Sequence, residues 1–340
     1  MPRQRQIRQI SSRPGSTYAA AARTPSARAR RSGELIAACV ALLLTTTPAV
    51  AQDLGHKLPG LLGLDAARIP EAGLYLVDRL ASYEADELRD RDGHLIPTAP
   101  FNLLGVANAF GASYTTRLSQ SSVFLTMTVG WPISRIKRDV EDRPEAAIDR
   151  FGLADPYVQP VRLGWRNGRS DVVMAYGIYL PTDRSPLAGG KGVSSGQITH
   201  EFSGGGSLYF KDRTAFLTAL ASYQLHMRQR GIDVTRGDAI QIEGGLGTKL
   251  FGQLAEAGLA GFAFWQVRDD RGADLPPVLR GARDRVYGLG PEAAILLKAI
   301  RGQVRVRAEW DIGARARPQG HIFVVGLNFF LASRGKPAGS

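Results

Sequence analysis

The most regular chemical pattern in this 340-residue sequence is a row of charged residues at every second position. Arg305, Arg307, Glu309 and Asp311 alternate with apolar residues, so an extended chain places all four on one side. Paired carboxylates could serve as a general acid and base, but arginines beside them favour a ladder of ion pairs. A second set of polar and charged residues, Gln241, Glu243 and Lys249, lies upstream. Together they are our candidate lumen-lining residues: Arg305, Arg307, Glu309, Asp311, Gln241, Glu243 and Lys249.

Residue types that carry nucleophilic or metal chemistry occur without the necessary spacing. No two of the five histidines have metal-ligand spacing, and neither a phosphate-binding loop nor a Gly-x-Ser-x-Gly motif is present. Ser222 and His226 would share one face of a strand. An outer-membrane lipid hydrolase, a less favoured alternative, requires these two side chains within hydrogen-bond reach on the lipid side. We therefore expect no catalytic residues, no metal and no cofactor.

The elements that must position the charged row are β-strands. Val304, Val306, Trp310 and Ile312 form the opposite face of 303–312, and only an extended chain separates charged from apolar residues in this way. The same period of two recurs along the chain. It predicts twelve strands, near 73–83, 103–115, 122–131, 157–166, 171–181, 196–210, 214–227, 237–251, 256–267, 285–297, 302–313 and 320–331.

The predicted strands are long, and their connections alternate in length. Several strands reach ten residues or more, the length that a tilted strand needs to cross a bilayer. Tight connections such as 166–169 and 211–213 alternate with long polar ones at 132–156, 182–195 and 268–284. Bacterial outer-membrane barrels have this pattern. We predict an all-β fold, an antiparallel transmembrane β-barrel of about twelve strands. A soluble β-sandwich, whose strands are usually shorter, is the alternative.

Aromatic residues lie in or at the ends of the predicted strands. Rings with a polar tip suit the interface between membrane and water, where barrels carry aromatic girdles. Aromatic residues are also common in strands of any kind, so the set carries more weight than any member. The expected membrane-interface aromatics are Tyr75, Trp131, Trp165, Trp265, Trp310 and Phe329.

Residues 1–51 have the order of a secretory signal peptide. An Arg-rich region almost free of acids precedes the apolar run 35–44, and 49–51 (Ala-Val-Ala) is a small-residue cleavage site. This part carries +7 of the formal net charge of +12, and also the single cysteine, Cys39. The remaining chain therefore has little excess basic charge for nucleic acid, and it has no thiol for a disulfide or a metal site.

The sequence thus divides into four parts. We expect a signal peptide at 1–51, and an N-terminal segment at 52–69 that lies in the periplasm or inside the barrel as a plug. An outer-membrane β-barrel follows at 70–331, and a polar C-terminal tail at 332–340. The expected location is the outer membrane of a Gram-negative bacterium, reached by export through the periplasm.

Several short motifs occur in a fixed order between residues 70 and 330. They are Pro-Glu-Ala-Gly-Leu-Tyr-Leu at 70–76, Asp-Arg-Asp-Gly at 90–93, Phe-Gly-Leu-Ala-Asp-Pro at 151–156, Leu-Gly-Trp at 163–165, Tyr-Leu-Pro-Thr at 179–182, Gly-Leu-Gly-Pro-Glu at 288–292 and Arg-Ala-Arg-Pro-Gln-Gly at 315–320. Together they resemble the family of outer-membrane barrels named for the meta-cleavage pathway of phenol degradation. The sequence departs from the family pattern at 192–202 and 210–214.

This resemblance implies an outer-membrane channel or transporter that admits aromatic or other hydrophobic compounds. We expect the compounds to pass by passive diffusion. The expected partners are outer-membrane lipids and a small hydrophobic or aromatic ligand, with no nucleic acid. Charged groups at the narrowest part of a pore determine its selectivity, so the charged row is the candidate selectivity site. The alternative is a non-conducting structural barrel of the envelope, in which the same ion pairs only stabilise the wall.

Overall fold

The computed structural model describes residues 56–97, 101–118, 122–141 and 147–332. The predicted signal peptide and most of the C-terminal tail lie outside these residues. The thirteen described strands are β1 (Gly73–Arg89), β2 (Phe101–Arg117), β3 (Val123–Val140), β4 (Ile148–Leu153), β5 (Tyr157–Arg166), β6 (Ser170–Tyr179), β7 (Thr199–Phe210), β8 (Ala215–His226), β9 (Ala239–Leu250), β10 (Ala255–Gln266), β11 (Arg285–Leu297), β12 (Gly302–Arg315) and β13 (Arg317–Ala332). Within the described ranges, no helix has the length and apolar character to cross a membrane.

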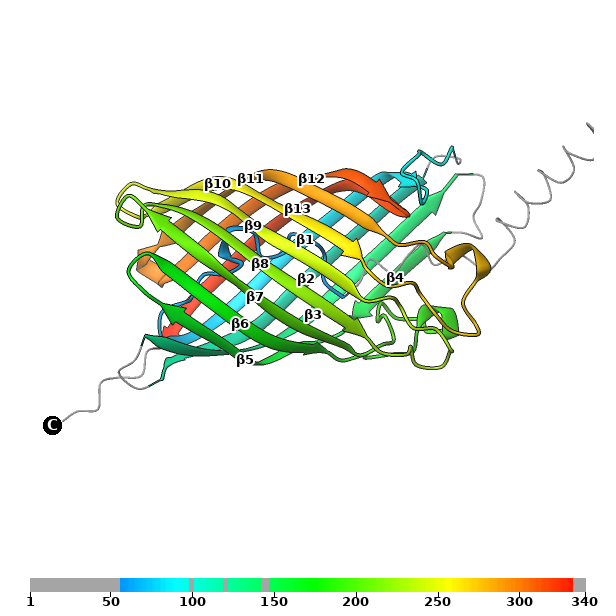
Figure 1. Ribbon diagram of the computed structural model, residues 1–340, viewed down its shortest axis with the longest axis horizontal. Coiled ribbons are helices and arrows are strands. Elements are labelled where there is room, and N and C mark those ends of the chain that lie inside the picture. Colours follow the sequence, from blue (N-terminus) through cyan, green and yellow to red (C-terminus); the bar gives the residue numbers. More distant parts are fainter. Residues whose placement is uncertain (1–55, 98–100, 119–121, 142–146, 333–340) are drawn as a thin grey trace, which may run out of the picture. The chain divides into compact units, whose positions relative to one another are not determined.

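The strands form one closed antiparallel sheet. Apart from β4 and β5, each strand pairs with its neighbours in sequence, and β1 closes the ring by pairing with β13 as well as with β2 (Figure 1). β4 and β5 both pair with β3, one after the other along its length, so the thirteen strands occupy twelve places. The predicted barrel of about twelve strands is therefore confirmed.

The predicted long loop at 132–156 is wrong. β3 continues to Val140, and β4 pairs with this continuation from Ile133↔Leu153 to Arg138↔Ile148. The outward positions of this part of β3 carry charged side chains, including Arg135. A search for apolar alternation therefore stops at the apolar part of β3, although the hydrogen-bonded strand extends further.

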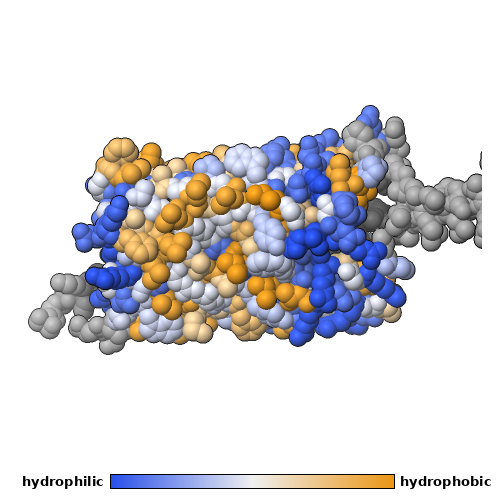
Figure 2. All heavy atoms as spheres, turned by 45° about the horizontal axis from the view of Figure 1, so that its top comes forward, coloured by the Kyte–Doolittle hydropathy of each residue, from blue (hydrophilic) through white to orange (hydrophobic). Residues whose placement is uncertain are grey.

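Alternate side chains point to the two sides of the wall as predicted. On β12, Trp310 and Ile312 are 54% and 56% exposed and point outward, whereas Arg305 and Arg307 are buried in the interior. Figure 2 shows hydrophobic side chains over the middle of the visible face and hydrophilic ones toward the ends. An apolar outer band and a charged interior is the arrangement expected of a barrel in a membrane, and the opposite of a soluble sandwich.

The two ends of the barrel differ in their connections. Tight turns at 167–169, 211–214, 251–254 and 298–301 lie at one end, together with the start of β1 and the end of β13. Longer connections at 180–198, 227–238 and 267–284 lie at the other end, although β12 and β13 are joined there by Ala316 alone. In bacterial barrels the short turns face the periplasm, so we call these the periplasmic and external ends.

Candidate functional site in the barrel interior

The predicted charged row forms an ion-pair network with neighbouring strands. Arg305 donates to Glu292 Oε1 at 2.6 Å and to Glu256 Oε2 at 3.0 Å. Arg307 donates to Glu292 Oε2 at 3.0 Å, and its Nε lies 3.3 Å from Glu309 Oε2. All five side chains are buried, and buried charges are tolerated only when they are paired. The ladder expected from the sequence is present, and its role in selectivity stays a prediction.

The other candidate lumen residues do not join this cluster as one group. Gln241 and Glu243 are buried on β9, both facing the interior. Asp311 lies nearer the external end and accepts a hydrogen bond from the Tyr83 hydroxyl at 2.7 Å. Lys249 is half-buried near the periplasmic end of β9. The predicted set is therefore spread along the barrel axis.

The N-terminal segment, which we define as residues 56–72, lies inside the barrel against this network (Figure 1). It contains one turn of 3-10 helix, η1 (Gly63–Asp65). Its backbone N–H groups donate to interior side chains of four strands, so that segment and wall satisfy each other's polar groups. These bonds are Leu62 N to Glu243 at 2.8 Å, Leu64 N to Glu292 at 3.0 Å, Ala67 N to Thr218 at 3.3 Å and Ile69 N to Asp171 at 3.3 Å.

Side chains of the N-terminal segment complete the ion pairs of the wall. Lys57 forms a buried ion pair with Glu243. Arg68 donates to both oxygens of Glu256, at 2.7 and 2.9 Å. Asp65 accepts from Arg305 at 2.9 Å. Bidentate and charge-assisted bonds of this kind are the strong ones, so the segment is anchored by charge at several points.

Two glycines allow the N-terminal segment to approach the wall. Gly60 and Gly63 have φ values of +78° and +51°, a region that L side chains rarely adopt. A β-carbon at Gly60 would collide with Glu309, and one at Gly63 would collide with Arg307 and Glu292. The charged row predicted from the sequence is thus covered directly by the backbone of the segment.

A hydrogen-bonded cluster around His56 fixes the other end of the segment. The His56 ring is hydrogen-bonded to Asp155 at 2.9 Å and to Thr199 at 2.9 Å, and it stacks on Tyr179 with ring centroids 5.0 Å apart. Asp155 lies in the connection between β4 and β5 and also accepts from the backbone N–H of Ser195 at 2.9 Å. We call these residues the His56 latch.

The electrostatics of the latch keep Asp155 ionised. Burial raises the pKa of this carboxyl group, but the hydrogen bond to His56 and the charge of that ring lower it. Hydrogen bonds from Ser194 and from the Thr182 N–H act in the same direction. The net effect sets the pKa of Asp155 at about 2. The negative charge that holds His56 is therefore present at any ordinary pH.

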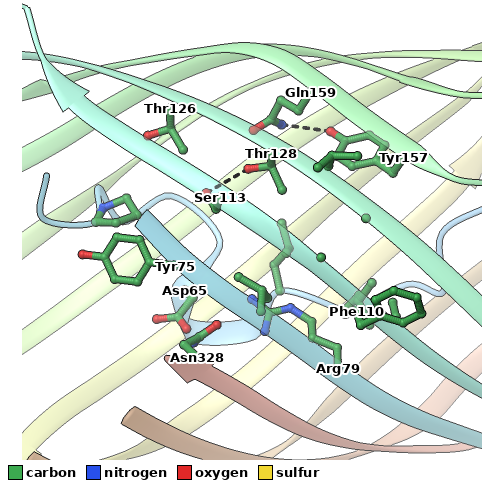
Figure 3. Close-up of a pocket in the computed structure, with 18 of the residues that line it drawn as sticks. Asp65, Tyr75, Arg79, Phe110, Ser113, Thr126, Thr128, Tyr157, Gln159 and Asn328 are labelled. Carbon is green, nitrogen blue, oxygen red and sulfur yellow. Dashed lines mark hydrogen bonds between the residues drawn. The ribbon is translucent and has the colours of Figure 1, made fainter. Parts of the chain in front are cut away.

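A cavity of about 760 Å³ lies between the N-terminal segment and the inner face of β1, β2 and β3 (Figure 3). Much of its surface is apolar, from Leu61, Val77, Ala81 and Ala109. Polar side chains are interspersed, and Figure 3 shows Ser113 bonded to Thr128 and Gln159 bonded to Tyr157 across the cavity from Asp65, Arg79 and Asn328. This size and mixture suit a small organic ligand.

A second cavity, of about 260 Å³, lies toward the external end. The two cavities share part of their lining, namely His56, Leu58, Ala107, Pro132 and Asp155. His56, Leu58 and Asp155 belong to the segment or the latch. Pro132 lies on β3 between the stretch that pairs with β5 and the stretch that pairs with β4. The shared residues therefore lie between the two cavities.

The serine and histidine considered for a lipid hydrolase face the interior. Ser222 and His226 are 2% and 1% exposed on β8. The Ser222 hydroxyl has no hydrogen-bond partner among the described residues, and His226 Nδ1 bonds to the Gly237 carbonyl at 2.9 Å. The pair therefore meets neither requirement of that alternative, contact with lipid or mutual hydrogen-bond reach.

The expected interface aromatics do not all lie on the same side of the barrel wall. Trp131, Trp165 and Trp310 are exposed on the outer face, at 43%, 37% and 54%. Tyr75 instead points inward, lines the large cavity and packs edge-on against Phe330, so its assignment to the interface is wrong. The register of β1 is the reason, because its outward positions are the even-numbered residues. Trp265 and Phe329 point outward and are half-buried, and an interface position for the outward-facing rings stays a prediction.

A closed antiparallel ring of twelve places, apolar outside and charged inside, defines the class of outer-membrane β-barrels. The family described as "Putative MetA-pathway of phenol degradation" matches residues 85–325. The chain belongs to this family, as the sequence motifs predicted.

Solved structures confirm the fold. The COG4313 outer membrane channel from Pseudomonas putida F1 is 10% identical, with a TM-score of 0.67 over 78% of this chain and 98% of that one. The transport unit of the autotransporter AIDA-I from Escherichia coli is 12% identical, with a TM-score of 0.51 over 84% of this chain and 98% of that one. No curated protein matches the chain by sequence.

Proposed function

We propose that the protein is an outer-membrane channel through which small hydrophobic or aromatic compounds diffuse passively. The observation that carries this proposal is the pair of cavities that occupy the two halves of one barrel and share the lining around His56. A barrel whose interior served only as a packed core would have no such space. The fold likeness to a channel from Pseudomonas putida agrees with this proposal.

The N-terminal segment is the proposed barrier in this channel. It is bound by hydrogen bonds and ion pairs to the β5–β12 side of the wall, and the large cavity lies on its other side, against β1–β3. A permeant would therefore pass between the segment and β1–β3 and then cross the narrow region beside Leu58 and Asp155. Passage needs neither a nucleotide nor a redox cofactor.

Planar bilayers containing the purified protein test this proposal. We expect stepwise currents in potassium chloride and, when phenol is added, added current noise as the compound enters the passage. Empty bilayers with the same detergent are the control. A wild-type protein that is silent with and without phenol would contradict the proposal.

A non-conducting structural barrel is the second candidate. The observation that favours it is the density of buried ion pairs between the segment and the wall, which resembles a permanent filling. Silence in bilayers, combined with an unfolding free energy that falls sharply when these pairs are removed, would support it.

A further inference from the structure

Arg79 is one of the cations that line the large cavity without an anionic partner among the described residues. Arg79 lies on the inner face of β1 and lines the cavity. Its guanidinium makes no hydrogen bond, and no ion pair within 4.0 Å, with any described residue. Figure 3 shows its side chain extending from β1 toward Asp65 and Asn328. An unpaired cation in a restricted interior is costly, so a negatively charged ligand would stabilise this position.

The acidic groups around the cavity are already engaged by other partners. Asp65 is paired with Arg305 at 2.9 Å and Arg68 at 3.4 Å. The remaining acids of the lining are Glu71, paired with Arg166 at 2.6 Å, Asp155, held in the latch, and Glu201, which accepts from Tyr157 at 3.1 Å and lies 3.9 Å from Lys57. Of the other unpaired cations of the lining, Arg162 donates to the carbonyl oxygens of Ala66 and Arg68, and Arg301 lies over the Phe330 ring. Arg79 has no such contact and is therefore available to a negatively charged ligand.

The surroundings of Arg79 indicate the chemistry of the rest of the ligand. Next to it along β1, Val77 and Ala81 present apolar surface on the same inner face, and Ala109 and Leu61 extend that surface. Neutral hydrogen-bonding groups, such as Asn328, lie at the same end of the cavity. A planar guanidinium that borders an apolar wall matches a carboxylate attached to an apolar body, because it can form two parallel bonds to the carboxylate.

We propose that this cavity binds a small monocarboxylate with an aromatic or aliphatic body, whose carboxylate is held by Arg79. This inference rests on the proposed channel function, because it names the class of compound that would occupy the passage. The body of the ligand lies along the apolar wall of β1 and β2. The binding step is non-covalent and requires no rearrangement of the ion pairs of the N-terminal segment.

Benzoate and benzamide form a matched pair of probes, since they have nearly the same shape and differ in charge. Calorimetric titration of the full-length protein in lipid nanodiscs should give at least tenfold tighter binding of benzoate. Arg79→Gln should lose at least tenfold in benzoate affinity and leave benzamide affinity unchanged, while Arg79→Lys should retain part of the preference. Arg228→Gln is the matched control, because it removes the same charge from an external connection.

The outcomes separate this inference from the channel itself. Equal affinity for the two probes in the wild type would overturn it, and this comparison does not depend on whether a variant folds. Undiminished benzoate binding by Arg79→Gln would also overturn it. Silent bilayers together with selective, Arg79-dependent benzoate binding would contradict the channel alone. Conductance without any benzoate preference would contradict the carboxylate site alone.

Discussion

At Gly63 the N-terminal segment comes so close to the wall that a side chain has no room. Gly63→Ala would place a β-carbon against Arg307 and Glu292 while φ is +51°. Positive φ costs alanine roughly 1–2 kcal/mol, and displacement of the buried ion pair adds to this cost. We expect trypsin to cleave after Lys57 and Arg68 at least tenfold faster than in the wild type, as followed by mass spectrometry.

The control for this variant is Gly252→Ala. Gly252 has a similar φ of +61°, but a β-carbon there meets nothing within 4 Å. Both variants therefore share the backbone cost, and they differ in the collision with the wall. Equal protection of Lys57 and Arg68 from trypsin in both variants would show that the segment is not tightly fitted at Gly63.

The ammonium group of Lys57 is buried in the barrel interior, with its side chain 4% exposed beside a Glu243 side chain at 0%. Removal of one partner from a buried pair typically costs about 3–5 kcal/mol, because the other charge is left uncompensated. Lys57→Gln should therefore release the segment and increase single-channel conductance in planar bilayers. Lys137→Gln breaks an exposed pair with Asp139 and should change nothing measurable. Identical currents from the two variants would argue against a plug.

At the scale of elements, the His56 latch joins the segment to the connection between β4 and β5. Because the pKa of Asp155 lies at about 2, below its ordinary value of 3.8, the folded state gains stability above pH 4. This contribution, roughly 2 kcal/mol, is lost as the pH falls from 4 toward 2. Conductance should rise over this window, measured in bilayers at stepped pH. In Asp155→Asn the rise should be smaller, and an unchanged rise would assign it to other carboxyl groups.

The elements also divide into those that the sequence predicts and those that it does not. Strands with apolar outward residues, such as β9 and β12, follow from alternation, because one face must avoid water. β4 was missed because its partner stretch of β3 carries charges on the outward face. The charged row on β12 was predicted from the same alternation, because its residues occupy the positions between the apolar ones.

The N-terminal segment shows the limit of such reasoning. Its sequence has no hydrophobic periodicity, because the segment is neither a strand nor a long helix. Its conformation is determined by contacts with residues far away in the sequence, such as that of Lys57 with Glu243. The role of His56, Arg68 and Arg79 was missed on the same grounds, since partners that lie on distant strands leave no local spacing. The glycines at 60 and 63, which lie between Lys57 and Arg68 in the sequence, were the available signal of a close approach.

At the scale of the whole molecule, the wall separates two solvents. Leu246 on β9 shows this on the outer face, where it is 56% exposed between Leu217 and Leu259 of the adjacent strands. In water, such rows of exposed leucines would cause aggregation, whereas in lipid they are the stable surface. The outer face is thus explained only if the barrel is surrounded by hydrocarbon.

This conclusion predicts that an arginine will destabilise the barrel within the apolar band but not in the turn at the end of the same strand. Leu246→Arg puts a guanidinium into the apolar band and should lower the unfolding free energy in lipid vesicles by roughly 2–4 kcal/mol. Phe251→Arg, in the tight turn that follows β9 and 78% exposed, should change it by less than about 1 kcal/mol, because water is within reach there. Urea titration followed by tryptophan fluorescence measures both. If Leu246→Arg is as stable as Phe251→Arg, the band around β9 does not face lipid, and the proposed passage through the interior cannot connect the two sides of a membrane.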